Sequence, residues 1–328
     1  MIGAPHVPPP RTALMAFAVL AIAAGIALLT AGADRMVVAA ARLSRAFGIS
    51  PLVVGALVVG FGTSAPELLV SSFAAGRGQL DLAIGNVVGS NTANLTLVVG
   101  LTALLAPLVG RLEIVRREGV LMLAGVAGMA LLLLDGALNR WESALLLTGM
   151  AACSLMLVRW AVRDRVAAAA AEDGVDDFTG GMTSPRYEMF VGSLALAVTL
   201  LGAEILLRGA VALTEELDIS AAFVGLTVVA VGTSLPELAT SLAAARRGEP
   251  DLVLGNVLGS NLFNSLAVTG VAGLIGPGTI DASFRPVLLL MVAVTGLAGV
   301  FLATGGRLVR AEGAALLGVF GLFVWVSA

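Results

Sequence analysis

Apolar runs of about 20 residues recur along the whole chain, and they restrict the fold more than any other feature of the sequence. A helix of that length spans a hydrocarbon core of roughly 30 Å. Apolar residues make up 58% of the chain and charged residues 12%, against about 45–50% and about 25% in a soluble domain. The runs are continuous rather than alternating, which excludes a membrane β-barrel. The sequence therefore predicts an all-α polytopic membrane protein.

We expect ten transmembrane helices in two sets of five. A short Pro-rich tail (residues 1–12) precedes the first set, which covers residues 13–162. The polar segment 163–188, with its acidic residues, glycines and proline, is typical of a loop that joins two halves, and the second set covers residues 189–328. The first run could be read as a signal peptide, but it continues helically past Asp34, and its counterpart near 189–217 lies mid-chain. The further expected spans are 52–75, 81–105, 119–137, 143–162, 189–217, 222–245, 251–275, 285–303 and 309–327.

The two halves are copies of one another. Residues 51–100 match residues 221–270 without a gap at 26 of 50 positions, at an offset of 170, whereas chance in such a composition gives roughly one position in ten. With an odd number of helices in each copy, the second must enter the membrane from the opposite side. The repeats are then inverted, an arrangement that places a transport site near the membrane midplane, where interrupted helices meet.

The distribution of basic residues predicts the orientation. All 19 are Arg. If the 163–188 loop is cytoplasmic, thirteen of them lie on the inner side and four on the outer side, in agreement with the excess of basic residues that inner loops carry. The sequence therefore predicts a multi-pass protein of the cell membrane with both termini outside.

Two carboxylates lie in the middle of apolar runs. A charge there costs at least about 2.5–3.5 kcal/mol, so it normally faces a cavity and has a partner. Thr63 and Ser64 precede Glu67 by four and three residues, which places the three on one face of a helix. The second copy repeats the arrangement with Thr233, Ser234 and Glu237.

A proline lies beside each carboxylate. Pro66 and Pro236 cannot donate a hydrogen bond to the carbonyls four residues before them, at Gly62 and Gly232. The sequence therefore predicts a kink or break that frees backbone oxygens next to each glutamate.

The following helix adds a polar stripe, because Asn86, Ser90 and Asn94 are spaced four residues apart. Its copy consists of Asn256, Ser260 and Asn264. Carboxylates, hydroxyls, amide oxygens and loosened carbonyls are the ligands of hard cations such as Ca²⁺ and Na⁺. The competing interpretation is packing, since small residues and interhelical Asn pairs also join membrane helices; a carboxylate beside a proline, present twice, favours the site. Asp34 and Glu204 either flank this site or pair locally with Arg35 and Arg208.

The segments GTSAPELLVSS…GNVVGSNTANL and GTSLPELATSL…GNVLGSNLFNS resemble the α-repeats of the sodium/calcium exchanger family. The resemblance implies a transporter rather than an enzyme, with helices 2, 3, 7 and 8 around the ion sites and no cofactor. Some members, notably in the potassium-dependent branch, have Asp where this chain has Asn264. The ligands that the resemblance implies are Thr63, Ser64, Glu67, Ser90, Asn94, Thr233, Ser234, Glu237, Ser260 and Asn264, with backbone carbonyls near Gly60 and Ala230.

These observations lead to the hypothesis of Na⁺/Ca²⁺ antiport by alternating access. The expected partners are Ca²⁺ and Na⁺ as transported substrates and the lipid bilayer, with no nucleic acid; each chain carries its own inverted pair, so a monomer suffices. Proton-coupled or K⁺-dependent Ca²⁺ antiport is the nearest alternative. A channel or a membrane scaffold is a more distant one.

Overall fold

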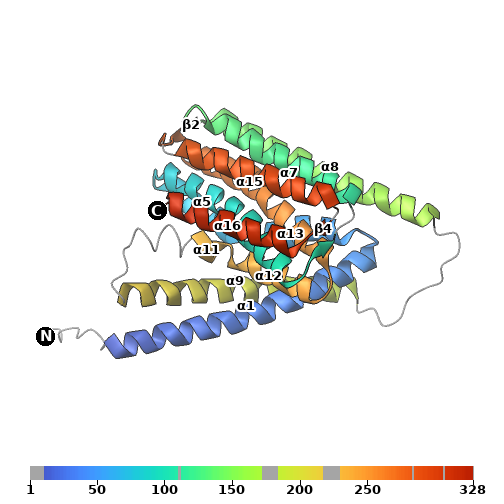
Figure 1. The fold of residues 1–328 in the computed structure, drawn as a ribbon, viewed down its shortest axis with the longest axis horizontal. Helices are drawn as coiled ribbons and strands as arrows, with labels where there is room; N and C mark the ends of the chain where they lie inside the picture. Colours follow the sequence, from blue (N-terminus) through green and yellow to red (C-terminus); the bar gives the residue numbers. More distant parts are fainter. Residues whose placement is uncertain are drawn as a thin grey trace, which may run out of the picture.

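The computed structural model describes residues 11–109, 112–171, 184–216, 230–282, 284–305 and 307–327, and these residues form a bundle of helices (Figure 1). The first half contains α1 (Arg11–Phe47), α2 (Pro51–Val54), the π-helix η1 (Gly55–Gly60), α3 (Phe61–Thr63), α4 (Ala65–Gly76), α5 (Leu80–Ala93), the π-helix η2 (Asn94–Val98), α6 (Val99–Leu105), β1 (Leu108–Val109), α7 (Leu112–Leu133), β2 (Ala137–Leu138) and α8 (Arg140–Ala171). The second half contains α9 (Pro185–Glu216), α11 (Ala230–Thr233), α12 (Leu235–Arg246), α13 (Pro250–Phe263), the π-helix η4 (Asn264–Val268), α14 (Thr269–Ile275), β3 (Gly278–Thr279), α15 (Phe284–Gly305), β4 (Arg307–Leu308) and α16 (Arg310–Ser327).

The described residues include six helices that are long and apolar enough to cross a membrane, and a bent pair of helices that would make a seventh span. All of them coincide with expected spans, and α1 continues past Asp34 as predicted. Helices α7 and α16 lie at two further expected positions. The expected span 222–245 is described only from Ala230 onward, and residues 1–10 of the expected tail lie outside the described residues.

The expected loop 163–188 is shorter than predicted. Helix α8 continues to Ala171 and α9 begins at Pro185. The last five residues of α8 are all alanine, the strongest helix former, and this local propensity outweighs the charged residues that suggested a loop from residue 163.

The duplication in the sequence recurs in the structure. At the offset of 170, α4 corresponds to α12, α5 to α13, η2 to η4 and α6 to α14. The turn glycines Gly78 and Gly248 both have a positive φ, 74° and 71°, a conformation that suits glycine because it has no Cβ.

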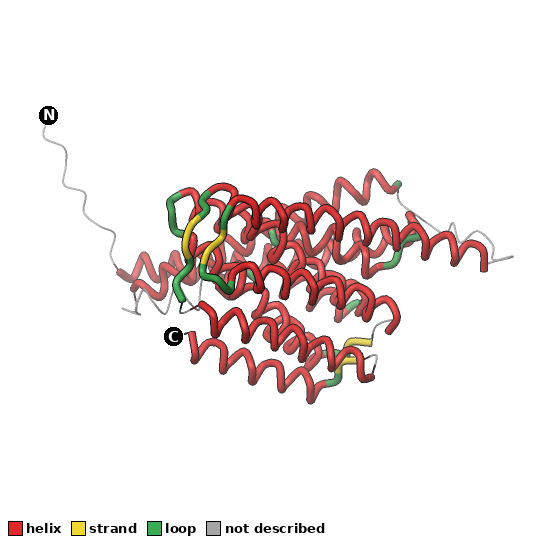
Figure 2. Tube along the Cα trace, turned by 90° about the horizontal axis from the view of Figure 1, so that it is seen from above, coloured by secondary structure: helices red, strands yellow, loops and turns green. Residues whose placement is uncertain are grey.

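Two small antiparallel sheets join the halves. β1 pairs with β4 and β2 pairs with β3, so each sheet takes one strand from each half. The repeat counterpart of β1 is β3 and that of β2 is β4, and the two sheets lie at opposite ends of the bundle (Figure 2).

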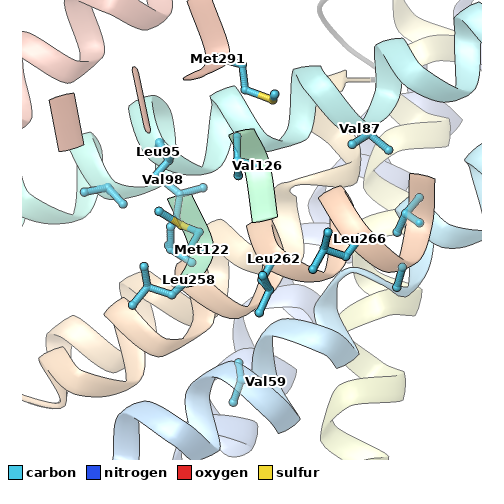
Figure 3. Packing of buried hydrophobic residues seen from close by; sticks show 14 of the residues in the cluster. Val59, Val87, Leu95, Val98, Met122, Val126, Leu258, Leu262, Leu266 and Met291 are labelled. Atoms are coloured by element: carbon cyan, nitrogen blue, oxygen red, sulfur yellow. The ribbon is translucent and has the colours of Figure 1, made fainter. Parts of the chain in front are cut away.

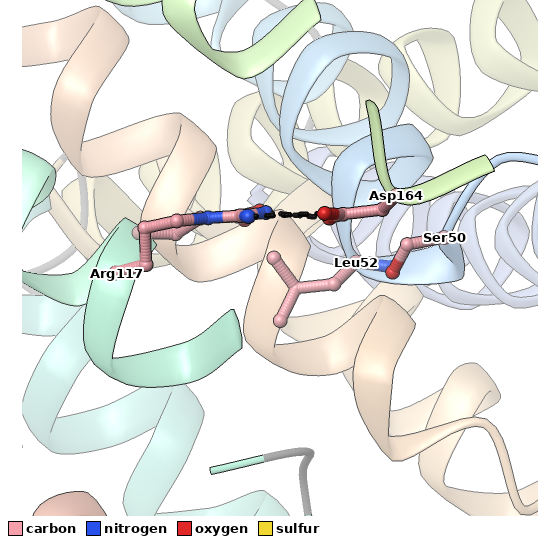
Figure 4. A network of polar contacts seen from close by, with 5 residues as sticks. Ser50, Leu52, Arg117 and Asp164 are labelled. Carbon is pink, nitrogen blue, oxygen red and sulfur yellow. Dashed lines mark hydrogen bonds and ion pairs between the residues drawn. The ribbon is translucent and has the colours of Figure 1, made fainter. Parts of the chain in front are cut away.

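The apolar core also draws on both halves. Val98 of η2, Met122 of α7 and Leu258 and Leu262 of α13 are buried together in one cluster (Figure 3). At one end of the bundle the guanidinium of Arg117 in α7 binds the carboxylate of Asp164 in α8 at 2.8 Å (Figure 4).

Helices α1 and α9 lie side by side at unusually close range (Figure 1). A Cβ added at Gly25 would lie 2.6 Å from the backbone nitrogen of Leu206, and one at Gly209 would lie 2.9 Å from the carbonyl oxygen of Ala18. Small residues permit this approach, as they do at many membrane-helix interfaces. Helices α1 and α9 therefore form one closely packed unit.

The close approach predicts that Gly25→Ala destabilises the folded protein. The added methyl group must push the two backbones apart, and overpacking of this kind costs typically about 1–3 kcal/mol. Gly318→Ala in α16 is the matched control, since a Cβ there meets no atom within 4 Å. Thermal unfolding in detergent is the measurement: Gly25→Ala should lower the melting temperature and Gly318→Ala should not. Equal melting temperatures would contradict the packing argument.

Candidate functional site

The candidate site is built around two broken helices. Helix α3 ends at Thr63, Ser64 leaves the helical region at φ −83° and ψ 11°, and α4 begins at Ala65 with a bend of 43°. In the second half Ser234 has nearly the same angles, −87° and 5°, and α12 begins at the next residue. A proline occupies the first turn of both helices, which confirms the predicted break.

Glu67 and Glu237 lie in the first turn after each break and are fully buried. Oε1 of Glu237 accepts hydrogen bonds from the hydroxyls of Ser64 at 3.0 Å and Ser260 at 3.4 Å. Among the described residues, Oε2 of Glu237 and both carboxylate oxygens of Glu67 have no hydrogen-bond partner. Buried polar groups almost always have one, so these oxygens are candidate ligands of a cation.

Amide side chains extend this set of unpaired atoms. Within the described chain, Oδ1 of Asn94, both polar atoms of Asn264 and the hydroxyl of Ser234 lack a hydrogen-bond partner. Asn94 is the first residue of η2 and Asn264 the first residue of η4. π-Helical turns frequently occur at functional sites, and here they begin at the two amides expected to be ligands.

Hydrogen bonds across the halves bring the predicted ligands together. The hydroxyls of Ser90 and Thr233 are hydrogen-bonded to each other at 3.3 Å, and the hydroxyl of Ser260 donates to the carbonyl oxygen of Gly60 at 3.0 Å. That carbonyl also accepts from the hydroxyl of Thr63 at 3.3 Å. All ten predicted side-chain ligands are buried: Thr63, Ser64, Glu67, Ser90, Asn94, Thr233, Ser234, Glu237, Ser260 and Asn264. Ala230 begins α11, and its role as a carbonyl ligand remains a prediction.

The first residue of each polar stripe, Asn86 or Asn256, hydrogen-bonds to the helix that follows the break. Asn86 donates to the carbonyl oxygen of Glu67 at 3.3 Å and to the hydroxyl of Ser71 at 3.0 Å. Asn256 repeats this toward the carbonyl oxygen of Glu237, at 3.1 Å, and toward Ser241, at 3.0 Å. The two serines were not among the predicted site residues, although they also recur at the offset of 170.

A second pair of asparagines was also missed. Nδ2 of Asn94 donates to Oδ1 of Asn261 at 3.0 Å, and Nδ2 of Asn261 donates to the carbonyl oxygen of Asn91 at 3.3 Å. These bonds join α13 to α5 and η2 directly beside Asn94. The signal was present in the repeated GSN motif, whose Asn occupies positions 91 and 261.

The peripheral charges differ in part from the expectation. Glu204 does pair with Arg208, at 2.6 Å. The local pair between Asp34 and Arg35 is wrong: Asp34 accepts from Nε of Arg247 at 2.7 Å, and Arg35 binds Glu188 at 3.0 Å. Consecutive residues of a helix point in different directions, and α1 contacts both α9 and α12.

The arrangement is suited to a hard cation. In the part of the chain that the structure describes, no three His, Cys, Asp or Glu side chains lie together. A bound ion would take two carboxylates and a surrounding set of hydroxyl and amide oxygens, which are the ligand types that Ca²⁺ and Na⁺ accept.

A bundle of apolar helices with a buried set of oxygen ligands between its halves is typical of a membrane protein that binds hard cations. The family model described as "Sodium/calcium exchanger protein" matches residues 17–159 and 189–328, and the chain belongs to this family of transporters. It is 39% identical to the "Putative antiporter CaxA" of Alkalimonas amylolytica, over 93% of this chain and 97% of that protein. It is 37% identical to the "Inner membrane protein YrbG" of Escherichia coli, over 82% of both chains.

A solved structure agrees with this assignment. The sodium-calcium exchanger NCX_Mj, soaked with Na⁺ and Sr²⁺, superimposes with a TM-score of 0.81 at 29% identity, over 95% of this chain and 99% of that chain. The fold of this chain is therefore of the same type.

The unpaired oxygens predict that Ca²⁺ stabilises the folded protein. A ligand that binds only the folded state stabilises it by about 2.7 kcal/mol at one hundred times its dissociation constant. We expect Ca²⁺ to raise the melting temperature of the purified protein, and Glu67→Gln or Glu237→Gln to remove most of that increase. Glu142→Gln should keep it, because Glu142 lies in the first turn of α8 and accepts a hydrogen bond from the backbone nitrogen of Asn139. If both site variants retain the full increase, the ion binds elsewhere.

Proposed function

We propose that this chain is an antiporter that exchanges Na⁺ for Ca²⁺ across the membrane by alternating access. The observation that carries the proposal is the set of buried oxygens on Glu67, Glu237, Asn94 and Asn264 that have no hydrogen-bond partner among the described residues. The proposed ligands are the ten buried side chains described above, with the carbonyl oxygens of Gly60 and Ala230.

The charge of the site supports exchange rather than uniport. Two ionised carboxylates in a closed, low-dielectric site are costly without a compensating charge. One Ca²⁺ or several Na⁺ supply that charge, whereas the empty site resists closure. A site that closes only when it is loaded must return with the other kind of ion, so the inward Na⁺ gradient expels Ca²⁺.

We infer ten spans in two inverted repeats of five, at residues 13–162 and 189–328. The two small sheets support this inference, because each strand and its repeat counterpart belong to different sheets, which lie at opposite ends of the bundle (Figure 2). The start of α1 and the end of α16 lie at the same end of the bundle, and α8 ends and α9 begins at the other (Figure 1).

The Arg distribution supports a cytoplasmic 163–188 loop and outer termini, and the E. coli relative is named as an inner membrane protein. In a Cys153→Ala background, an impermeant thiol reagent should label Gln79→Cys on intact cells and Ser184→Cys only after lysis. Both positions are exposed. Labelling of Ser184→Cys from outside would reverse the proposed orientation.

Proton coupling is the second candidate, because Glu67 and Glu237 are titratable. Asn94 and Asn264 count against it, since an amide is an oxygen ligand without a proton to exchange. Asn264 also counts against K⁺ dependence, because members of the potassium-dependent branch have Asp at this position.

The coupling ion is tested in proteoliposomes. An outward Na⁺ gradient in K⁺-free buffer should drive ⁴⁵Ca²⁺ uptake, and Glu67→Gln or Glu237→Gln should abolish it because each removes a charge that binds Ca²⁺. Asn264→Asp should change the pH dependence or the Na⁺ affinity before Ca²⁺ binding is lost. Uptake that requires K⁺, or that follows a pH gradient without Na⁺, would assign the alternative coupling.

A further inference from the structure

Two charged positions recur in both halves outside the ion site. Asp34 on α1 corresponds to Glu204 on α9, and Arg77, in the turn after α4, corresponds to Arg247, in the turn after α12, all at the offset of 170. The chain therefore carries two possible acid–base pairs, Asp34 with Arg247 and Glu204 with Arg77. Under the proposed topology the first pair is at the cytoplasmic end and the second at the outer end.

Of these two pairs, the described residues form only the cytoplasmic one. Arg247 donates from Nε to Oδ1 of Asp34 at 2.7 Å, and α1 lies along α12. Glu204 instead binds Arg208 of its own helix at 2.6 Å, and Arg77 forms no ion pair with any residue that the structure describes. Among the described elements, α9 makes no comparably extended contact with α4. Equivalent parts of the two halves are thus closed at one end and apart at the other.

We propose that the two acid–base pairs are alternating latches of the transport cycle, a proposal that rests on alternating access as the proposed function. In inverted repeats, exchanging the conformations of the two halves turns a protein open to one side into one open to the other. In the opposite state, Asp34 releases Arg247, and Glu204 leaves Arg208 to bind Arg77. The close-packed pair of α1 and α9 moves as one unit against α4 and α12.

The partial exposure of these groups fits a latch. The side chains of Asp34 and Arg247 are 50% and 41% exposed, and that of Glu204 is 50% exposed. A half-exposed ion pair shifts a two-state equilibrium by at most roughly fivefold, so it biases the equilibrium without locking it. A buried pair would resist opening, because separating its partners leaves charges unpaired.

The halves also differ in a way that gives the equilibrium a direction. Arg45 on α1 forms a second ion pair with Glu249, at 3.6 Å, beside the cytoplasmic latch. The corresponding positions at the outer end are Glu215 and Gln79, which cannot pair by charge. Among the described residues, the state that is closed at the cytoplasmic end has three of these ion pairs, Asp34–Arg247, Arg45–Glu249 and Glu204–Arg208. The opposite state would keep only Glu204–Arg77, so the resting protein favours the first state.

Cross-linking between the halves tests the latches without reference to which ion is transported. In a Cys153→Ala background with a protease site between α8 and α9, three variants carry cysteine pairs: at 34 and 247, at 77 and 204, and at 42 and 188. After treatment with a bis-maleimide, protease separates the two halves unless they are linked. The 42/188 pair is the control, because Arg42 binds Glu188 at 2.6 Å within the unit of α1 and α9.

We expect the 34/247 and 77/204 pairs to cross-link, and each link to stop transport, whereas the 42/188 link should leave transport intact. Arg247→Gln should accelerate cross-linking of the 77/204 pair roughly two- to fivefold, the effect of one half-exposed ion pair on a two-state equilibrium. Exchanging the charges, with Asp34→Arg and Arg247→Asp together, should restore the original rate. The cross-linking rate of the 42/188 pair should be the same with and without these substitutions.

Failure of the 77/204 pair to react during turnover, a rate unaffected by Arg247→Gln, or full transport in the linked protein would overturn the latches. If the latches behave as expected while Ca²⁺ uptake follows protons rather than Na⁺, the coupling ion changes and the latches stand.

Discussion

Two buried carboxylates impose the main constraint on this structure. Glu67 and Glu237 lie in the interior of a helical bundle, where an ionised group without a partner is costly. Three of their four oxygens have no hydrogen-bond partner among the described residues. The helix breaks at Ser64 and Ser234, the π-helical turns at Asn94 and Asn264 and the surrounding hydroxyls are all arranged around this deficit of positive charge. A cation is the simplest group that removes it.

Neither half of the chain holds this site alone. Ser64 of the first half donates to Glu237 of the second, and Ser260 of the second donates to the carbonyl oxygen of Gly60 in the first. The terminal sheets follow the same rule, since each pairs strands from both halves. A site at such an interface responds to relative movement of the halves, which is the physical requirement of alternating access.

Much of the site could be predicted because its signals are local. A proline beside a glutamate in an apolar run predicts both a break and a buried charge, and i, i+4 spacing predicts which side chains share a face. The partner of Asp34 could not be found in this way. Sequence neighbours suggested Arg35, whereas the actual partner Arg247 is 213 residues away, and only the packing of α1 against α12 brings it near.

The sequence by itself determined the helices, the duplication and the oxygen chemistry, because hydrophobic run length, repeat offset and side-chain type do not depend on distant contacts. The tertiary structure decided which polar atoms find partners and which do not. Asn86 and Asn94 belong to the same predicted stripe, yet Asn86 donates a hydrogen bond to the backbone of Glu67, whereas Oδ1 of Asn94 has no partner in the described part of the chain. Hydrogen-bond partners across the two halves are set by how the helices pack together, and that packing is a property of the whole fold.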